Sequence, residues 1–360
     1  MQVVDLVIAF FLSAITTLAV TPFIKKIAIK LKCVDMPDNN RKKHERTTAS
    51  MGGLAIFIGT AVGFLYLQPE NSQMTAIIVG AIIMLLTGIL DDIIGLKPLY
   101  KLIGQTSAAL VVALSGVVIE KLTIPFFGTV YLEGIGIIIT IFWIVAASNA
   151  INLIDGLDGL AAGVSGIALS SILVLAIIDY RIVVISLCVI LIGSCVGFLY
   201  HNFHPAKIFM GDTGALFLGY SIAVISMLGL FKNVALFSFI IPIMVIALPV
   251  FDTILSILRR IIKRESIATA DHEHIHYRLM EMGYSHKTSV IILYGFSVFF
   301  GILAITFNSG ALLTSAITTV VLIIGIQLIV EIAGIAKGGK QPILDRIRKI
   351  IGTEKVKRNG

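Results

Sequence analysis

Charged residues are scarce in this chain of 360 residues. Only 14% of them are Asp, Glu, Lys or Arg, against about a quarter in a typical soluble domain, and 57% are hydrophobic. The longest polar stretches, at 25–50, 259–288 and from Lys337 onward, are too short to fold as a soluble domain of their own. The composition therefore excludes a soluble or disordered protein and indicates an integral membrane protein.

Segments that alternate polar and apolar residues, the pattern of a membrane β-barrel, are also lacking. Instead the sequence contains apolar runs of about 20 residues, the length of an α-helix that crosses the hydrocarbon core. Helices satisfy every backbone hydrogen bond in lipid, so we expect an all-α integral membrane protein with about eleven transmembrane helices. The expected helices are 3–24, 51–68, 74–90, 102–119, 134–148, 159–178, 182–200, 214–230, 234–257, 289–307 and 311–333.

The few charges that are present have a strong positional bias. The net charge is +7, but the Lys and Arg residues lie at the ends of apolar runs and form no soluble basic face, so we expect no nucleic-acid partner. When the loop at 25–50 is assigned to the cytoplasm, alternation of eleven helices leaves all but three of the 28 Lys and Arg residues inside. The exceptions are Lys121, Arg181 and Lys232. This bias predicts an outside N-terminus, a cytoplasmic C-terminus, a polytopic membrane domain at 1–333 and a basic cytoplasmic tail at 334–360.

The sequence has only three cysteines, and two of them, Cys188 and Cys195, share one expected helix, so no disulfide framework is predicted. The first apolar run has no basic residues before it and no small-residue cleavage site, so we expect an uncleaved anchor. On the outer side, 119–134 has β-forming residues around a glycine and is compatible with either a small hairpin or a plain loop.

Polar residues other than Lys and Arg gather in four loops. These read DDIIGLKPLYK at 91–101, NAINLIDGLDG at 149–159, HNFHPAKIFMGDTG at 201–214 and DHEHIHYR at 271–278. The expected topology puts all four on the cytoplasmic side. Charges at membrane depth are costly and usually face a partner or a cavity, so we expect the loops to converge on one active site at the cytoplasmic face. Helix capping by Asp and Asn at the water interface is the alternative.

Three carboxylates in these loops suggest a metal site. Asp91 and Asp92 stand at the end of an apolar helix, where the helix dipole is already negative and a neighbouring cation is needed. Asp212 adds a third carboxylate from another loop, between glycines that leave room for a ligand. Oxygen ligands without cysteine suit Mg²⁺, or Mn²⁺ in its place, and Mg²⁺ takes few protein carboxylates because phosphates and water complete its shell.

Cationic side chains in the same loops suggest a phosphate substrate. Lys101, directly before the next expected helix, and the cations of 271–278 are placed to bind phosphates. Magnesium, carboxylates and cations together are typical of phosphoryl transfer, in which positioning and charge neutralisation do most of the catalysis. The glycine-rich loop of P-loop ATPases is lacking, which argues against an ATPase.

His272, Glu273 and His276 match the HExxH motif of zinc proteases literally. That motif works on a helix with a third ligand following it, whereas this copy lies in a polar loop. A zinc site here would also leave the three carboxylates without a role. We therefore keep an intramembrane zinc protease only as a minor alternative.

Six motifs occur in order along nearly the whole chain. They are RKKH at 41–44, MGGLAIF at 51–57, LDDIIGLKP at 90–98, NAINLIDGLDGLAAGVS at 149–165, NFHPAKIFMGDTGALFLG at 202–219 and HIHYRL at 274–279. Together they resemble the motifs of the polyprenyl-phosphate N-acetylhexosamine-1-phosphate transferases. Within that family they are more similar to the bacterial enzymes that initiate wall teichoic acid or O-antigen than to the muramoyl-pentapeptide branch.

The resemblance implies a multi-pass enzyme of the bacterial plasma membrane that uses UDP-GlcNAc and undecaprenyl phosphate. The lipid phosphate would attack the β-phosphorus of the donor, while Mg²⁺ or Mn²⁺ bridges the pyrophosphate. GlcNAc-1-phosphate is then transferred, UMP is released, and undecaprenyl-pyrophosphate-GlcNAc begins a cell-envelope polymer such as wall teichoic acid. Whether the chain forms a homodimer is left open.

The resemblance also implies roles for individual residues. Asp91 and Asp92 match the catalytic pair, with Asp91 orienting or deprotonating the lipid phosphate. The expected metal ligands are Asp212, Asn152 and Asp92. The positions expected to bind the substrates are Lys101, Asn149, Asn152, Asp155, Asp158, His274, His276, Arg278 and His44.

One residue departs from the family pattern. Tyr277 stands where the related enzymes usually have another histidine, and a phenol is uncharged at neutral pH and longer than an imidazole. Other donors, such as UDP-MurNAc-pentapeptide or UDP-GalNAc, therefore remain alternatives. A transporter of an anionic substrate is the alternative from another class, but it should have repeated halves and polar residues at mid-span, which this sequence lacks.

Overall fold

The computed structural model describes residues 2–35, 48–124, 128–230, 240–263, 274–308 and 312–334. The strands form two antiparallel pairs, β1 with β2 and β3 with β4, and the other described elements are helices. In chain order the elements are α1 (Val3–Lys30), β1 (Val34–Asp35), β2 (Thr48–Ala49), α2 (Gly53–Leu67), α3 (Met74–Ile94), α4 (Pro98–Leu114), β3 (Lys121–Ile124), β4 (Gly128–Tyr131), α5 (Ile135–Ile154), α6 (Leu160–Ile178), α7 (Ile182–Asn202), α8 (Gly211–Leu230), α9 (Ile240–Val245), α10 (Ala247–Lys263), α11 (Ile275–Glu281), α12 (His286–Phe307) and α13 (Leu312–Ile332).

The helices confirm an all-α membrane architecture. Among the described residues, eight helices are long and apolar enough to cross a membrane: α1, α3, α5, α6, α7, α8, α12 and α13. Helices α2 and α4 are also apolar but shorter, and they coincide with two further expected spans. A helix that is apolar on all sides is stable in lipid or inside a protein core, so these elements form a bundle in the bilayer. The three cysteines are free and buried.

The expected helix at 234–257 is interrupted in the structure. Residues 234–239 lie outside the described part of the chain, and the remainder forms the short α9 and then α10, with Ile246 between them. Pro249 lies in the first turn of α10, where a backbone N–H has no intrahelical acceptor and a proline is tolerated. The structure thus corrects one expected helix to two, because the proline favours a new helix start.

Helix α1 is longer than the expected 3–24 and continues past Pro22 to Lys30. Proline removes the N–H that would bond to the carbonyl of Leu18. His201 of α7 replaces it, since its Nε2 lies 3.0 Å from the Leu18 carbonyl oxygen. A side chain of the adjacent helix thus satisfies the carbonyl that the proline leaves free, and α1 does not end there.

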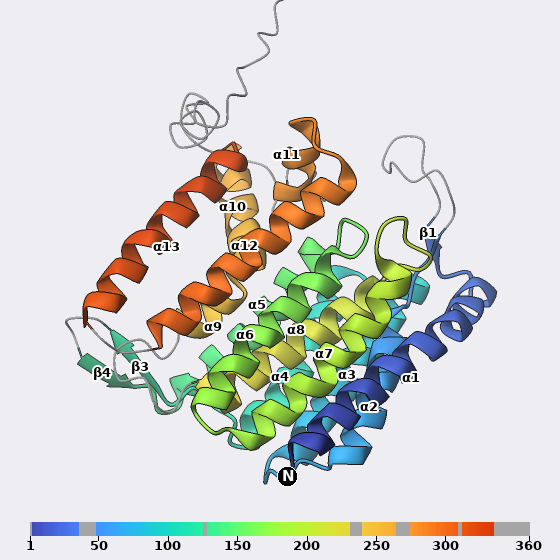
Figure 1. Ribbon diagram of the computed structural model, residues 1–360, viewed down its shortest axis with the longest axis horizontal. Helices are drawn as coiled ribbons and strands as arrows, with labels where there is room; N and C mark the ends of the chain where they lie inside the picture. Colours follow the sequence, from blue (N-terminus) through green and yellow to red (C-terminus); the bar gives the residue numbers. More distant parts are fainter. Residues whose placement is uncertain are drawn as a thin grey trace, which may run out of the picture.

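Different elements lie at the two ends of the helix bundle (Figure 1). The N-terminus and the β3–β4 hairpin lie toward one end, and β1 and α11 lie toward the other. The hairpin pairs Lys121 with Tyr131 and Ile124 with Gly128, which decides between the hairpin and the plain loop that the sequence leaves open. This division agrees with the expected alternation, which places the N-terminus and 119–134 on one side.

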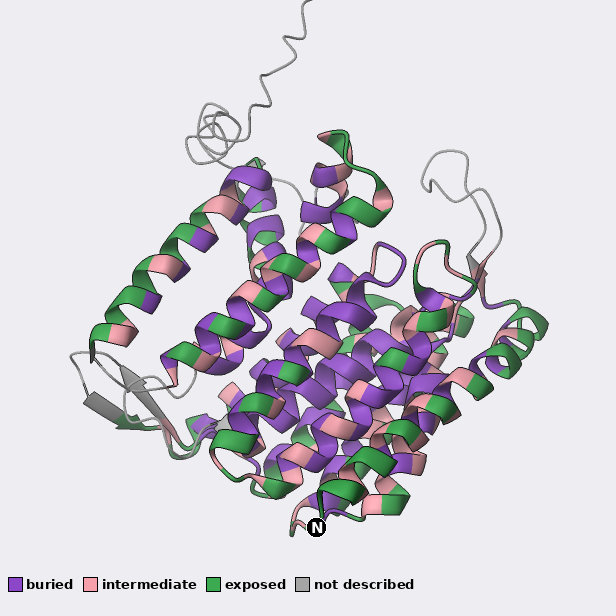
Figure 2. Cartoon of the chain, in the orientation of Figure 1, coloured by how far each residue is buried: buried purple, intermediate pink, exposed green. Residues whose placement is uncertain are grey.

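Helix α8 lies in the middle of the bundle, packed against α2, α3, α5 and α6. Figure 2 shows buried residues concentrated on the inner helices and many exposed residues along α1 and α13. Glycines allow close packing at the start of α8. A Cβ on Gly53 of α2 would lie 2.0 Å from the Gly214 nitrogen, and a Cβ on Gly88 of α3 would lie 2.5 Å from the Thr213 Cα. Helices α2 and α3 can therefore approach the first turn of α8, which carries Asp212.

Candidate active site

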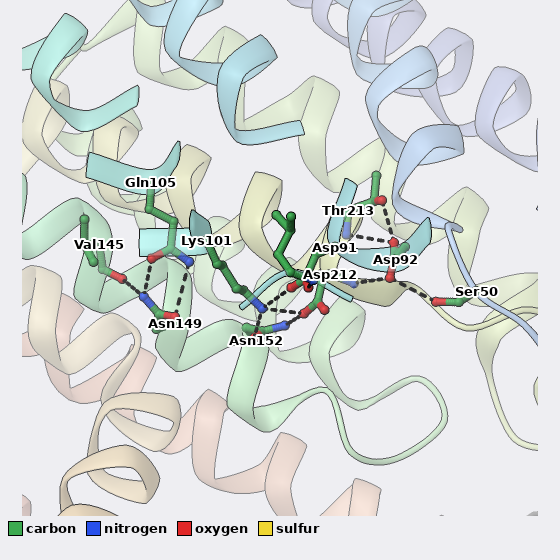
Figure 3. Close-up of polar contacts among 11 residues, drawn as sticks. Ser50, Asp91, Asp92, Lys101, Gln105, Val145, Asn149, Asn152, Asp212 and Thr213 are labelled. Carbon is green, nitrogen blue, oxygen red and sulfur yellow. Dashed lines mark hydrogen bonds and ion pairs between the residues drawn. The ribbon is translucent and has the colours of Figure 1, made fainter. Parts of the chain in front are cut away.

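Lys101 lies at the centre of a cluster of carboxylates and amides where four helices meet (Figure 3). Its Nζ is 2.8 Å from Asp91 Oδ2, 2.9 Å from Asp212 Oδ1 and 3.0 Å from Asn152 Oδ1. Lys101 belongs to the first turn of α4, and its partners come from the ends of α3 and α5 and the start of α8. The side chains of Lys101 and Asp91 are only 17% and 10% exposed, so water screens this ion pair weakly.

Asp91 is placed by the turn that ends α3. Gly95 closes the helix with a φ of +64°, a conformation that glycine adopts without strain. Asp91 Oδ1 accepts the backbone N–H of Leu96 at 2.8 Å, which leaves Oδ2 for Lys101 on the following helix. The cation expected beside this carboxylate is therefore the Lys101 ammonium.

Asp92 has a different partner, the N-terminus of α8. Its Oδ1 accepts the backbone N–H of Asp212 at 3.0 Å, and its Oδ2 accepts that of Thr213 at 3.1 Å and the Thr213 hydroxyl at 2.5 Å. The Ser50 hydroxyl donates to Oδ1 at 3.4 Å. A helix N-terminus offers free N–H groups and the positive end of the dipole, so it stabilises a carboxylate that the C-terminus of α3 disfavours. Asp92 thus caps a helix, and that helix comes from a distant part of the sequence.

The contacts of Asp92 bear on its expected role as a metal ligand. Both of its carboxylate oxygens accept hydrogen bonds from α8, whereas the Asp212 side chain extends toward Lys101 and accepts a hydrogen bond from Asn152 Nδ2. Gly211 permits this close approach, because its φ is +72° and a Cβ there would lie 2.6 Å from Asp92 Oδ2. Metal binding by Asp92 stays a prediction, and the contacts favour Asp212 and Asn152 for that role.

Asn149 and Asn152 lie one turn apart on α5 and differ in their contacts. Asn152 joins the Lys101 cluster directly. Asn149 instead exchanges two hydrogen bonds with Gln105 of α4, at 2.7 Å and 3.3 Å. Neither Gln105 nor Thr213 is predicted from the sequence. For Gln105 the available signal was a single amide within an apolar helix, a position where a polar side chain usually has a specific partner.

Asp155 follows α5 and lies in the electrostatic field of the cluster. Burial, followed by the negative charges of Asp212, Asp92 and Asp158, raises its pKa well above the usual value for an aspartate. The structure thus brings Asp155 near the expected catalytic carboxylates. Its expected contact with the nucleotide stays a prediction.

Asp158 forms a second cluster with His204 and His286. Asp158 Oδ2 accepts the backbone N–H of Ala206 at 3.0 Å and lies 2.7 Å from His204 Nδ1, while His286 Nε2 is 4.0 Å from Oδ1. The two imidazoles stack at 4.3 Å. Their ligand atoms and that of Asp158 lie within 4.8 Å of one another, a donor set that zinc accepts. The direct hydrogen bonds give the cluster a structural role, since they tie the loop after α5 to the loop after α7.

Residues 274–278, the described part of the loop at 271–278 and called the late loop below, are held in place by Asp252 of α10. Asp252 Oδ1 accepts the backbone N–H of Ile275 at 2.9 Å, and Oδ2 lies 3.0 Å from Nδ1 of His274, the N-cap of α11. Two residues after His274, His276 is 1% exposed and packs against Gly156. A Cβ on Gly156 would lie 2.3 Å from His276 Nε2. The late loop therefore meets the loop after α5 at a glycine.

Burial also sets the charge of the late loop. Burial lowers the pKa of His276 to about 4, although the charge of Asp252 opposes the shift. His276 is therefore uncharged at neutral pH, and its expected role in neutralising donor phosphates does not fit this conformation. Arg278 is partly exposed and forms an ion pair with Glu281 at 3.1 Å.

Some residues of the predictions lie outside the described part of the chain: His44, His272 and Glu273. The last two belong to the HExxH match, which ends at His276 on α11. His274 is the N-cap of α11 and has an extended backbone, with φ −60° and ψ 155°. One helix therefore does not run through the match, as a zinc protease requires.

The Lys101 cluster suits chemistry on phosphates. Asp91, Asp212 and Asn152 offer carboxylate and amide oxygens, which are the ligand atoms that Mg²⁺ prefers, and the described contacts of the cluster involve no thiol or imidazole. Lys101 adds a compact positive charge of the kind that binds phosphate oxygens. Together these groups can neutralise the charge that develops during phosphoryl transfer.

Comparison with known proteins decides the family. Residues 74–230 match the family model of glycosyl transferase family 4. A Bacillus subtilis protein named "Probable undecaprenyl-phosphate N-acetylglucosaminyl 1-phosphate transferase" is 44% identical over 352 residues, which cover 97% of this chain and 98% of that protein. The chain belongs to the polyprenyl-phosphate N-acetylhexosamine-1-phosphate transferase family.

Two further relatives show the breadth of this transferase family. A decaprenyl-phosphate N-acetylglucosaminephosphotransferase of Mycolicibacterium smegmatis is 35% identical over 81% of this chain and 79% of that protein. A phospho-N-acetylmuramoyl-pentapeptide-transferase of Listeria monocytogenes is 37% identical over 63% of this chain and 76% of that protein. The matched residues 74–230 extend from α3 to α8 and include the whole Lys101 cluster. The resemblance inferred from the loop motifs is confirmed.

Proposed function

We propose that this transferase moves GlcNAc-1-phosphate from UDP-GlcNAc to undecaprenyl phosphate. The products are UMP and undecaprenyl-pyrophosphate-GlcNAc, the first intermediate of a cell-envelope polymer. The observation that carries the proposal is the Lys101 cluster, in which one ammonium contacts two carboxylates and an amide from three other helices. The similarity of nearly the whole chain to the Bacillus subtilis protein supports the choice of donor and acceptor.

In the proposed reaction an oxygen of the lipid phosphate attacks the β-phosphorus of UDP-GlcNAc. The bond from that phosphorus to the bridging oxygen breaks, and the bridging oxygen leaves on UMP. Asp91 orients the lipid phosphate or accepts its proton, and Lys101 neutralises charge on the phosphates. The Arg278 guanidinium on α11 is assigned to the donor phosphates.

We assign Asp212 and Asn152 as the residues that would hold Mg²⁺, or Mn²⁺ in its place. Their oxygens fit a hard divalent cation, and Lys101 already shows that a positive charge is stable between them. When bound, the ion would neutralise the pyrophosphate of the donor. Asp92 has the supporting role of holding the first turn of α8, and with it Asp212, in place.

The same proposal includes a location and a topology. We place the protein in the bacterial plasma membrane with its N-terminus outside, its C-terminus in the cytoplasm and its active site facing the cytoplasm. Eleven crossings result when α2, α4 and the interrupted α9–α10 pair are counted with the eight long helices. The positional bias of Lys and Arg supports this orientation.

Release of UMP tests the function. Purified protein in detergent is given undecaprenyl phosphate and, in parallel, UDP-GlcNAc, UDP-GalNAc or UDP-MurNAc-pentapeptide, and UMP is measured with and without Mg²⁺. We expect Mg²⁺-dependent release that is fastest with UDP-GlcNAc and absent without the lipid. Faster release with another donor would change the assigned sugar. Uptake of an anion without any UMP release would identify a transporter.

A further inference from the structure

One turn beyond Lys101, α4 buries a second polar side chain. Gln105 is 1% exposed, and its amide faces Asn149 of α5 (Figure 3). Gln105 Nε2 donates to Asn149 Oδ1 at 3.3 Å, and Gln105 Oε1 accepts from Asn149 Nδ2 at 2.7 Å. The same Nδ2 also donates to the carbonyl of Val145 at 2.8 Å. The two side chains form a reciprocal amide pair that joins α4 to α5 inside the bundle.

The amide pair lies one helical turn from the Lys101–Asn152 contact on both α4 and α5. Gln105 follows Lys101 by one turn of α4, and Asn149 precedes Asn152 by one turn of α5, so the two contacts lie on the same helix faces. The Lys101–Asn152 contact at 3.0 Å is one connection between the helices, and the amide pair is the next. A slide or rotation of α4 along α5 would break both.

The amide pair allows fewer alignments of α4 along α5 than apolar contacts would. Dispersion contacts between apolar side chains are non-directional, whereas a reciprocal amide pair requires four atoms at fixed distances. A buried amide left without a hydrogen-bond partner destabilises the folded state. Few alignments of α4 and α5 other than the observed one can satisfy Gln105 and Asn149 together.

We propose that Gln105 and Asn149 are positioning residues for Lys101. Their amide pair fixes α4 against α5 so that the Lys101 ammonium reaches its three partners at once. This assignment rests on the proposed function where transfer is the readout, and it gives Asn149 a role other than the expected contact with substrate. Positioning matters because a displacement of about 1 Å can lower a rate about 10²-fold.

Exchange of the two amides tests the assignment. Gln105→Leu and Asn149→Leu each remove one partner, whereas Gln105→Asn combined with Asn149→Gln restores an amide pair of the same total length. We expect each Leu variant to lower kcat for UMP release at least about 10-fold while the donor KM changes less than about 2-fold. The exchanged double variant should recover most of that loss.

A second readout does not depend on catalysis. Lys101 is acylated with an amine-reactive reagent under native conditions, and its labelling is measured by mass spectrometry. We expect slow labelling in the wild type, because the ammonium is buried and paired, and labelling faster by at least about 3-fold in the Leu variants. The exchanged variant should return to slow labelling.

Thr60 and Ser194 provide a matched control. Their hydroxyls bond at 3.0 Å between α2 and α7, where no residue of the Lys101 cluster lies. Thr60→Val should lower Tm without changing kcat or Lys101 labelling. If Gln105→Leu keeps wild-type kcat and labelling, or if the exchange recovers neither, the assignment is wrong. A raised donor KM with normal kcat in Asn149→Leu would instead make Asn149 a substrate contact. Wild-type protein that releases no UMP contradicts the proposed function, and Lys101 labelling still decides the positioning role.

Discussion

Asp92 Oδ1 accepts the backbone N–H of Asp212 at 3.0 Å, so the last turn of α3 holds the first turn of α8. Two adjacent carboxylates at a helix C-terminus are thereby stabilised by two different neighbours. The Lys101 ammonium compensates Asp91, and the N-terminus of α8 compensates Asp92. The second interaction also aims the Asp212 side chain at Lys101, which links the stability of the site to its chemistry.

Replacing either Asp91 or Asp92 by a neutral residue should abolish most of the transferase activity. We expect Asp91→Asn and Asp92→Asn each to lower kcat at least about 10²-fold. At position 91 the acid–base or electrostatic group is lost. At position 92 the amide offers one acceptor oxygen where the carboxylate offers two, so Asp212 is displaced. The protein should still insert, purify and bind lipid. Near-normal UMP release by both variants would reduce the pair to helix caps, because Asn caps helices as well as Asp does.

Removal of the Asp92 side chain should destabilise the protein more than removal of the Asp91 side chain. Asp92→Ala removes the cap of α8, so we expect it to destabilise the protein by about 1 kcal/mol, measured as a lower Tm. Asp91→Ala should have a smaller effect on Tm, since Oδ1 makes one local turn contact and Lys101 keeps Asp212 and Asn152 as partners. Equal losses of Tm would contradict this division of roles.

Asp212→Asn should weaken the metal site. We expect turnover to require a higher Mg²⁺ concentration than in the wild type or to be lost, because a hard anionic ligand is replaced by a neutral amide. The measurement is UMP release as a function of Mg²⁺ and Mn²⁺ concentration. Full activity of Asp212→Asn at low Mg²⁺ would show that this carboxylate does not hold the ion.

Protonation of His276 should destabilise the protein in mild acid. In the unfolded chain a histidine binds its proton below a pKa of about 6.5, whereas in the folded chain His276 does so only near 4. Between these values the unfolded state binds more protons, so this residue's contribution to stability is full above about pH 6.5 and is lost as pH falls toward 4. The measurement is Tm against pH, and His276→Gln should flatten the curve in this window. An unchanged slope in that variant would contradict the burial of a neutral imidazole.

The late loop should act through positive charge and not through zinc. We expect a zinc-selective chelator to leave UMP release intact and Arg278→Ala to raise the donor KM or lower kcat. The His204–Asp158–His286 cluster makes this a stringent test, since it offers a second set of zinc ligands. Activity that is lost on chelation and restored by zinc alone would return a zinc ion to the mechanism.

The sequence was sufficient to predict the all-α membrane fold class and the four residues of the Lys101 cluster, but neither Gln105 nor Thr213. Long apolar runs without charge have one stable state in lipid, and carboxylates at their ends need a cation, so the convergence of Asp91, Lys101 and Asp212 follows from general principles. The contacts of Asp92 with α8 could not be predicted, because they depend on which helix start packs beside the end of α3. The spacing of residues in the sequence does not show which helices are neighbours.

Three further differences between the expected and the observed structure have identifiable causes. The helix expected at 234–257 is divided because Pro249 favours a new start, while α1 continues through Pro22 because His201 satisfies the freed carbonyl. His276 was expected to be a cation, and it is uncharged because it is buried against Gly156. A tertiary hydrogen bond decides the case of α1 and burial decides that of His276, and neither is visible in local sequence.

The most direct test of the central claim is UMP release by Lys101→Met. Methionine is similar in length to lysine and has no charge, so the variant removes the ammonium from between Asp91, Asp212 and Asn152 and adds little strain. Purified wild-type and variant proteins are compared with UDP-GlcNAc, undecaprenyl phosphate and saturating Mg²⁺, and folding is verified by Tm. We predict that kcat falls at least about 10²-fold in a variant that remains folded. Release of UMP at the wild-type rate would show that the cluster around Lys101 is not the catalytic centre.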